Sequence, residues 1–304
     1  MRILTHIVTP DEDGRTAGSL LRRHFCLSSS LLKAIKWRPG GITLNGQTVP
    51  VSARCRSGDR LCADVSDPPC HNPNLHPVPY PLDIVWEDED LLVLNKPAGL
   101  TVHCASLTHD PVTVAGAVAY YLHADAFHGV NRLDRGTTGL LVAAKSGYIH
   151  ARCMELLHTG AFYREYLAVC VGAPSPSAGS IDLPIGRAEA SLVKRCPRPG
   201  GLPAHTDYET LATSGSFSLL RLLPATGRTH QLRVHMAAIG CPLAGDWLYG
   251  TEDHSLISRP ALHSYRLHLR HPVTGLLLDL TAPLPPDMQR LVPFPPFQPP
   301  ENPL

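Results

Sequence analysis

Apolar residues recur at helical spacing near the start of the chain. One stripe of this kind is formed by Ala17, Leu20, Leu21 and Phe25. A serine run at 28–30 can cap a second helix, whose apolar residues lie within 31–35. Asn45-Gly46 then separates two apolar runs and favours a tight hairpin turn. The pattern between residues 16 and 65 therefore predicts two short helices followed by a hairpin.

After residue 82 the pattern changes to short apolar runs separated by Gly and Pro. Helical spacing predicts helices at 113–122, 147–158 and 228–239. Short runs rich in β-formers predict strands at 84–95, 139–145, 162–171, 206–212, 216–223, 262–269 and 276–281. Short strands predominate over the spacing of βαβ units. We therefore expect an α+β domain around a mixed, mainly antiparallel sheet.

Prolines mark the expected domain boundaries. Residues 67–81 contain six prolines in fifteen positions, which is typical of an extended, semi-rigid spacer. The sequence thus predicts a small module at 1–66, a Pro-rich linker at 67–82 and a larger domain at 83–282. A Pro-rich tail at 283–304 is expected to be poorly ordered.

Composition argues against several kinds of protein. The nine cysteines form no Cys-x-x-Cys pair, so a disulfide framework or zinc knuckle is not expected. Among the seventeen histidines, His230 and His235 are five apart and fall off one helical face, and we predict no metal. No apolar run has membrane-spanning length. These observations predict a soluble, cytoplasmic protein that is monomeric and has no membrane partner.

The charge balance limits how the chain can bind nucleic acid. Its net charge is +1, whereas a general nucleic-acid binder is visibly basic. Any RNA contact must therefore be local. One early segment carries a basic cluster, made up of Arg22, Arg23, Lys33, Lys36 and Arg38. A single such face is enough for phosphate attraction, although a run of charge is also what an ordinary solvated surface shows.

One aspartate stands out as a candidate for chemistry. Asp134 lies between Arg132 and Arg135 in a Gly/Thr loop that leads into the apolar run LLVAAK. Neighbouring cations favour the ionised carboxylate, which is then available as a nucleophile or a base. An aspartate in a surface salt bridge would give the same local pattern.

The run NRLDRGTTGLLV resembles the catalytic loop of the RluA family of RNA pseudouridine synthases, which implies that Asp134 is the catalytic aspartate. Three more segments resemble that family in type and order: WEDEDLLVLNKPAGLTVH, REYLAVCVG and TGRTHQLRVHMAAIGCPLAGDWLYG. The resemblance implies that Tyr166 stacks on the target uracil. It also implies that Arg233 pairs with the catalytic aspartate and that Leu232 lines the base pocket.

Other positions gain expected roles from the same resemblance. Arg132 is expected to hold the space that the flipped base leaves. Asn131 stands where many members have histidine, and an asparagine keeps the capacity to donate and accept hydrogen bonds. The segment 1–66 resembles an S4-type RNA-binding module.

The implied activity is the isomerisation of uridine to pseudouridine in structured RNA, ribosomal or transfer. This reaction needs no redox change and no outside atom, so no cofactor is expected. Two alternatives remain. One is an RNA-binding or ribosome-assembly factor that keeps the fold without catalysis. The other is a hydrolase that combines Asp134 with His103 or His230.

Overall fold

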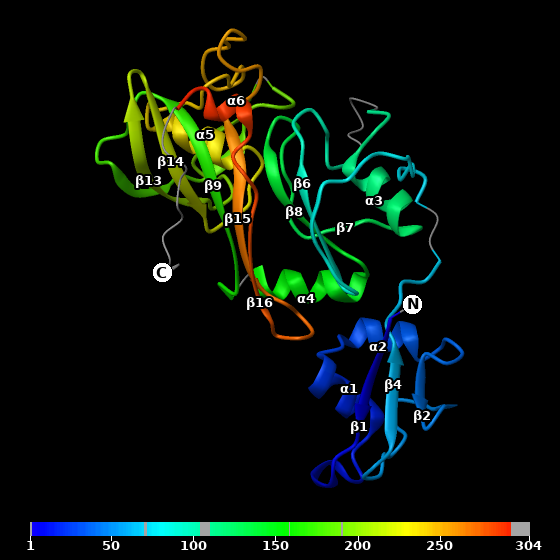
Figure 1. Ribbon diagram of the computed structural model, residues 1–304. Coiled ribbons are helices and arrows are strands. Elements are labelled where there is room, and N and C mark those ends of the chain that lie inside the picture. The colour runs from blue at the N-terminus through cyan, green and yellow to red at the C-terminus, as the bar shows by residue number, and fades with distance from the viewer. Residues whose placement is uncertain (1, 70–71, 104–109, 158, 190, 293–304) are drawn as a thin grey trace. The chain divides into compact units, whose positions relative to one another are not determined.

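The computed structural model describes residues 2–69, 72–103, 110–157, 159–189 and 191–292 (Figure 1). The chain separates into two compact units. Unit 1 comprises Met1–His71 with Lys145–Arg152, and unit 2 comprises Asn72–Ala144 with Cys153–Leu304. The second half of the Pro-rich segment thus belongs to unit 2, where the amide of Val78 donates to the carbonyl of Gly116.

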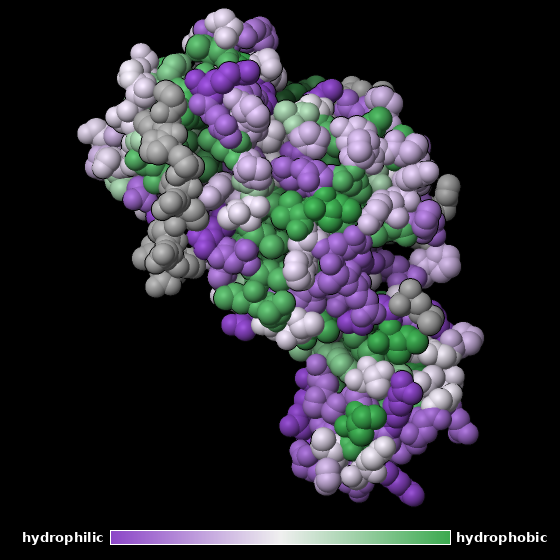
Figure 2. Space-filling model, in the orientation of Figure 1, coloured by the Kyte–Doolittle hydropathy of each residue, from purple (hydrophilic) through white to green (hydrophobic). Residues whose placement is uncertain are grey.

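Unit 1 is a four-stranded antiparallel sheet with two helices. The strand order is β1 (Ile3–Ile7), β4 (Arg60–Asp64), β2 (Ile42–Leu44) and β3 (Gln47–Thr48). A short 3-10 helix η1 (Pro10–Glu12) precedes α1 (Ala17–Phe25) and α2 (Ser29–Ile35). On the face shown in Figure 2, hydrophilic residues cover most of this unit.

The local signals of unit 1 act as predicted. The Ser28 hydroxyl accepts from the amide of Leu31 and caps α2. Asn45 and Gly46 have φ angles of 51° and 85°, which a tight hairpin turn requires. The strand β1 was not predicted, because its alternation turns only Leu4 fully inward and leaves a weak apolar signal.

Unit 2 is built on a ten-stranded mixed sheet. Its strands are, in order, β10 (Ala178–Asp182), β13 (His205–Ser214), β14 (Phe217–Pro224), β9 (Phe162–Val171), β15 (Leu262–Arg270), β8 (Thr138–Ala144), β6 (Leu91–Lys96) and β5 (Ile84–Glu87). β16 (Leu277–Thr281) pairs with β15, and β7 (His128–Gly129) pairs with β8. Only β15 and β8 run parallel among the described strands of this sheet, which confirms the mixed, mainly antiparallel architecture.

Three helices of the chain were predicted at nearly the observed bounds: α3 (Val114–Leu122), α4 (Gly147–Leu157) and α5 (Gln231–Ala238). The strand expected at 84–95 is instead the hairpin β5–β6, because the acidic residues 88–90 form its turn. A separate small hairpin joins β11 (Ile185–Arg187) to β12 (Arg195–Pro197). No described helix has the length and apolar character needed to cross a membrane.

The expected disorder of the tail is wrong for its first part. Residues 286–289 form α6 (Pro286–Gln289), and Met288 is fully buried. Met288, Leu291 and Val292 belong to a core cluster that includes Leu167 of β9, so burial of these apolar side chains orders the segment despite its prolines. The remainder, 293–304, lies outside the described residues.

A close approach of β15 to β8 fixes the end of the loop that contains Asp134. Gly139 has a φ of 102°, and a Cβ there would lie 2.2 Å from the carbonyl oxygen of Ser264. Only glycine permits this spacing. Beside it, the Thr138 hydroxyl bonds His263 Nδ1 at 2.8 Å, and His263 Nε2 bonds the Ala282 carbonyl at 3.1 Å. The buried His263 ring therefore ties both strands to the following segment.

This histidine predicts an acid-sensitive contribution to stability. Burial lowers the pKa of His263 from 6.5 to about 4. Between these two pH values the unfolded chain therefore binds a proton at His263 that the folded chain does not bind. The free energy of unfolding is therefore unaffected by this histidine above pH 6.5, and it falls by about 3 kcal/mol as the pH drops to 4. His263→Gln cannot titrate, so its midpoint of thermal unfolding should fall less steeply between pH 7 and 4. Parallel pH curves for variant and wild type would rule this contribution out.

Candidate active site

A pocket in unit 2 brings together segments that are far apart in the sequence. It is lined by residues of the loop before β8, of β9, of the turn after β14 and of α5, among them Arg132, Asp134, Tyr166, Leu232 and Arg233. These five were predicted as site residues from three separate segments. The sheet order places β9 between β14 and β15, and β15 beside β8, so the fold itself assembles these segments.

Asp134 faces a buried arginine across this pocket. Its Oδ2 lies 3.6 Å from Nη1 of Arg233, and the Asp134 side chain is 22% exposed while that of Arg233 is 6% exposed. The resemblance implied a pair between these two residues, and a guanidinium commonly forms such a pair through two nitrogens. The structure differs, because Arg233 spends its other nitrogens elsewhere: Nε and Nη2 donate to Asp246 at 2.7 and 2.6 Å.

Asp246 is the residue that holds Arg233 in place. It is fully buried, and its Oδ1 also accepts from the amides of Leu248 and Tyr249 at 3.1 and 3.2 Å. Burial lowers the pKa of Arg233, but the hydrogen bonds that it donates to Asp246 and the charges of Asp246 and Asp134 outweigh this effect and raise that pKa overall. Arg233 is therefore a permanent cation aimed at Asp134.

The sequence reasoning missed Asp246. A polar Gly-Asp dipeptide between apolar residues, thirteen positions after Arg233, was the signal available. Charged residues are almost never fully buried unless paired, so such a dipeptide in an apolar surrounding suggests a partner of opposite charge.

His230 forms a second polar contact beside the aspartate. Its Nε2 lies 3.9 Å from Asp134 Oδ2, and its Nδ1 is 2.8 Å from the hydroxyl of Tyr249. The Tyr249 ring also lies under the Arg233 guanidinium, 5.0 Å away. His230 precedes α5 with a left-handed φ of 59°, an uncommon conformation for a residue with a side chain. Burial lowers the pKa of His230, which favours the neutral ring.

The arginine that follows Asp134 has a different role from the one predicted. Arg135 Nε donates to the Gly99 carbonyl at 3.0 Å, and its Nη1 pairs with Asp110 at 3.3 Å. The cation that pairs with Asp134 comes from α5 instead. Arg135 thus ties the loop to the segment 96–100 and leaves the carboxylate free to face the pocket.

Lys96 supports the same loop from the buried side. Its Nζ contacts the carbonyls of Pro97, Leu100 and Arg135 at 2.7, 2.8 and 3.2 Å. Burial lowers the pKa of Lys96 to about 7, with the Arg259 charge adding to the effect and that of Asp134 opposing it. Three carbonyl acceptors match the three N–H bonds of an ammonium. The residue is therefore a positioning group for the loop.

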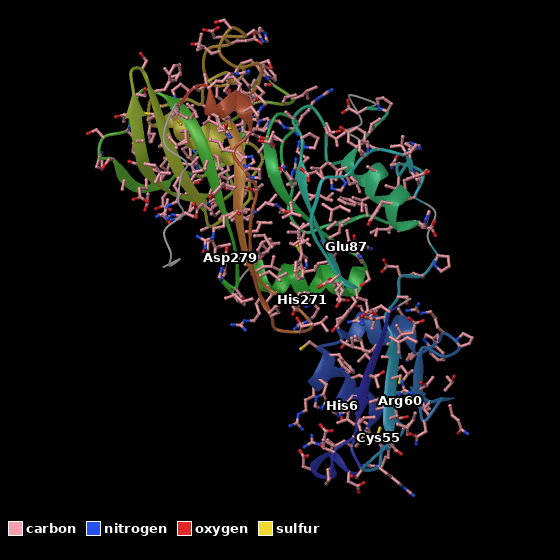
Figure 3. The ribbon with its side chains drawn as sticks, in the orientation of Figure 1. His6, Cys55, Arg60, Glu87, His271 and Asp279 are labelled. Atoms are coloured by element: carbon pink, nitrogen blue, oxygen red, sulfur yellow. The ribbon has the colours of Figure 1, made fainter. Side chains whose placement is uncertain are left out.

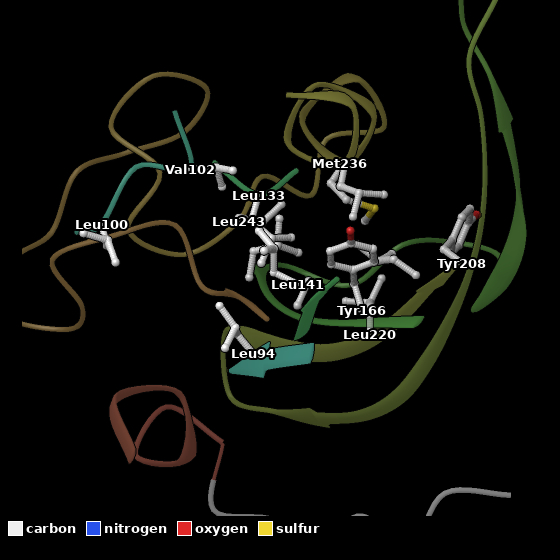
Figure 4. Close-up of a cluster of buried hydrophobic side chains, with 14 of the residues drawn as sticks. Leu94, Leu100, Val102, Leu133, Leu141, Tyr166, Tyr208, Leu220, Met236 and Leu243 are labelled. Carbon is white, nitrogen blue, oxygen red and sulfur yellow. The ribbon is translucent and has the colours of Figure 1, made fainter. Parts of the chain in front are cut away.

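Tyr166 is both a core residue and part of the pocket lining. Its side chain packs with Leu133, Leu220 and Met236 in the cluster shown in Figure 4, and it is 6% exposed. Burial raises the pKa of its hydroxyl, so the group stays protonated at neutral pH. Leu232 joins the same cluster and lines the pocket as well. The two provide an aromatic and an aliphatic surface close to Asp134.

Asn131 and Arg132 occupy different environments although they are neighbours. Arg132 is exposed and lines the pocket. Asn131 is buried. Its Oδ1 accepts from the Val142 amide at 2.8 Å and its Nδ2 donates to the Leu140 carbonyl at 3.3 Å. These bonds hold the loop against β8, and the expectation that Asn131 is among the substrate-binding residues stays a prediction.

In unit 1, the basic cluster contains both exposed side chains and one that is bonded within the fold. Arg22 and Lys33 are exposed on α1 and α2. Arg38 donates instead to the carbonyls of Ser66 and Asp64, so its guanidinium is committed to the fold. Lys36 lies 4.6 Å from the ring centre of Trp37, whose side chain is 80% exposed. Trp37 was missed because a lone tryptophan has no periodic signal.

The histidines of the hydrolase alternative do not form one set with Asp134. His230 approaches it, whereas His103 contacts Phe127 edge-on, with ring centres 5.2 Å apart. Asp134, Arg233 and His230 together place one carboxylate beside a buried cation and an imidazole, in a pocket that Tyr166 also lines.

Comparisons with known proteins agree with this site. The family model for RNA pseudouridylate synthase matches residues 90–238. The chain is 35% identical over 270 residues to the RNA pseudouridine synthase YjbO of Bacillus subtilis (strain 168), covering 88% of this chain and 94% of that protein. It is 39% identical over 232 residues to ribosomal large subunit pseudouridine synthase D of Yersinia pestis, covering 71% of each.

A solved structure shares the fold. Human RNA pseudouridylate synthase domain containing 1 superimposes with a TM-score of 0.56 at 27% identity, covering 67% of this chain and 83% of that one. The matched segment 90–238 contains Asp134, Tyr166 and Arg233, the three residues that the fold gathers at the pocket. The chain belongs to the RluA family of RNA pseudouridine synthases.

Proposed function

We propose that this enzyme converts uridines of large-subunit ribosomal RNA to pseudouridine, with Asp134 as the group that starts the reaction. The observation that carries the proposal is a single partly exposed carboxylate, 3.6 Å from the buried Arg233 guanidinium, in a pocket walled by Tyr166. The identity of 39% to a relative named ribosomal large subunit pseudouridine synthase D supports the choice of RNA.

The second carboxylate of the site is unsuited to this role. Both oxygens of Asp246 are occupied by Arg233, and Oδ1 accepts from two further amides, with no exposed surface left. Asp134 keeps oxygen surface toward the pocket. One guanidinium contact, from Arg233, orients the Asp134 carboxylate without covering it.

The pocket also suits an everted base. In this proposal the target uridine turns out of the RNA, its ring stacks on Tyr166 and packs against Leu232, and the exposed Arg132 fills the vacated space. Stacking on an aromatic surface is worth about 1–3 kcal/mol per base, enough to offset part of the unstacking cost.

The chemistry is an isomerisation in which the base keeps all of its heavy atoms. The bond between N1 and C1′ breaks, uracil rotates in the closed site, and a bond forms between C5 and C1′. The hydrogen on C5 is lost and N1 gains a proton. Asp134 either attacks C1′ or removes a proton from C2′, and both routes require an ionised carboxylate beside the sugar.

Mapping pseudouridines in RNA from cells with and without the gene tests the proposal. We expect particular pseudouridines to disappear from large-subunit ribosomal RNA and to return with the wild-type gene. Their loss from transfer RNA alone would overturn the choice of RNA. A growth defect that an Asp134→Asn gene rescues, with no pseudouridine restored, would favour a ribosome-assembly factor without catalysis.

The S4-like module is part of the same proposal, as the RNA-binding element. We expect the double change Arg22→Gln and Lys33→Gln to weaken RNA binding and to reduce the slope of log Kd against log salt by about 1–2, because each neutralised phosphate contact releases about one counterion. Both residues are exposed, so folding should be unaffected. Arg270→Gln with Arg290→Gln removes the same charge from exposed sites of unit 2 and is the matched control. Equal slopes for both double variants would argue against the role of the module.

A further inference from the structure

Three potential metal ligands converge in unit 1, whereas Asp134, Tyr166 and Arg233 belong to unit 2. His6 comes from β1, Glu12 from η1 and His24 from the last turn of α1. One ligand atom of each lies within 4.8 Å of the others, and this is the one such group among the residues that the structure describes. Figure 3 labels His6 beside α1.

The two imidazoles point the same nitrogen at one carboxylate. His6 Nε2 lies 2.6 Å from Glu12 Oε2, and His24 Nε2 makes a short contact with Oε1. The rings stack with their centres 3.8 Å apart and their planes 20° apart. The amide of Thr9 donates to Oε2 at 3.2 Å and fixes the carboxylate. Three elements of the fold thus hold the donor atoms in place before any ligand arrives.

The carboxylate of this group is deeply buried, whereas the two imidazoles are partly exposed. The Glu12 side chain is 2% exposed, against 16% for His6 and 29% for His24. A buried carboxylate needs a cationic partner. Arg23, whose Nη1 is 3.8 Å from Oε1, supplies one positive charge near Glu12. A divalent ion bound between the three ligands would supply another, and the exposed side of His24 gives it access to the site.

We propose that His6, Glu12 and His24 form a binding site for a divalent transition-metal ion of the zinc type. Two imidazole nitrogens and one carboxylate oxygen are donors suited to Zn²⁺, Co²⁺ or Ni²⁺, whereas Mg²⁺ and Ca²⁺ prefer oxygen ligands alone. Water completes the coordination. The ion joins β1, η1 and α1, and takes over from Arg23 as the partner of Glu12.

The site would therefore be structural and would stabilise the module. Because the ligands come from positions 6, 12 and 24, a bound ion closes two chain loops within one small unit. It also releases Arg23, whose side chain is 52% exposed, for contact with solvent or phosphate. The prediction that the chain has no metal site was drawn from spacing alone, and spacing does not show that β1, η1 and α1 meet.

Metal binding to the untagged full-length protein, stripped with a chelator, tests the proposal without reference to activity. Titration calorimetry with ZnCl₂ should show one site with a Kd in the micromolar range or below, and Zn²⁺ should raise the midpoint of thermal unfolding while Mg²⁺ does not. His24→Ala should weaken Zn²⁺ binding at least tenfold, as should His6→Gln. His254→Ala, which removes a histidine that is 68% exposed, is the matched control and should bind like wild type.

Co²⁺ provides an independent readout, because tetrahedral coordination gives strong visible absorption that should be absent in His24→Ala. The proposal is overturned if wild type binds no Zn²⁺, or if folded His24→Ala and His6→Gln bind it as tightly as wild type. Circular dichroism of the metal-free variants shows whether they are folded.

Discussion

Asp134→Asn should abolish pseudouridine formation while leaving the protein folded and able to bind RNA. Asparagine nearly preserves the shape of aspartate but lacks the charged oxygen that either route needs. The stability cost should stay below about 1 kcal/mol, because the pair with Arg233 is a single contact of a partly exposed carboxylate. The measurement is tritium release from RNA labelled at C5 of uridine, together with RNA affinity and the midpoint of thermal unfolding.

Asp125→Asn is the matched control, since Asp125 is an exposed aspartate of the same unit and should leave tritium release unchanged. Tritium release by the Asp134→Asn protein at the wild-type rate would mean that Asp134 is not the reacting group.

Arg233→Lys should lower turnover on the order of 10³-fold, short of complete loss. Lysine keeps a positive charge, but one ammonium cannot donate to both oxygens of Asp246 and also face Asp134 as the three guanidinium nitrogens do. Disruption of this buried pair should also cost stability, up to roughly 3–5 kcal/mol. Single-turnover rates must therefore be measured well below the unfolding midpoint of the variant.

Asp246→Asn separates positioning from charge. The variant still contains Arg233 and Asp134, but it lacks the negative charge that orients the Arg233 guanidinium. Turnover should therefore fall while RNA affinity is kept. For the preceding prediction on Arg233→Lys, the control is Arg270→Lys, which makes the same exchange at an exposed position. If folded Asp246→Asn turns over like wild type, the proposed orienting role of Asp246 is wrong.

Local signals in the sequence were enough for most elements. The serine cap before α2, the Asn45-Gly46 turn and the apolar spacing of α3 and α5 act between residues a few positions apart, so they can be read along the chain. The hairpin β5–β6 was read as one strand and the first part of the tail as disordered. The turn of this hairpin is itself a local feature, whereas contacts with distant core residues order the first part of the tail.

In the site, too, contiguous motifs were visible in the sequence, whereas contacts between distant residues were not. The motifs around Asp134, Tyr166 and Arg233 were recognised from the sequence, because each is a contiguous run of residues. The partners of these residues were not. Arg233 donates two of its nitrogens to Asp246, thirteen residues away, and Arg135 donates to the carbonyl of Gly99, 36 residues away.

The sequence by itself therefore determined the order of the elements, the mixed sheet and the aspartate at the centre of the site. Only the tertiary structure decided which cation faces that aspartate, that Asn131 supports the loop from within, and that His6, Glu12 and His24 meet. The physical reason is that hydrogen bonds and ion pairs between buried side chains depend on direction and on a few ångströms of distance. Those quantities are set by the packing of distant strands and helices.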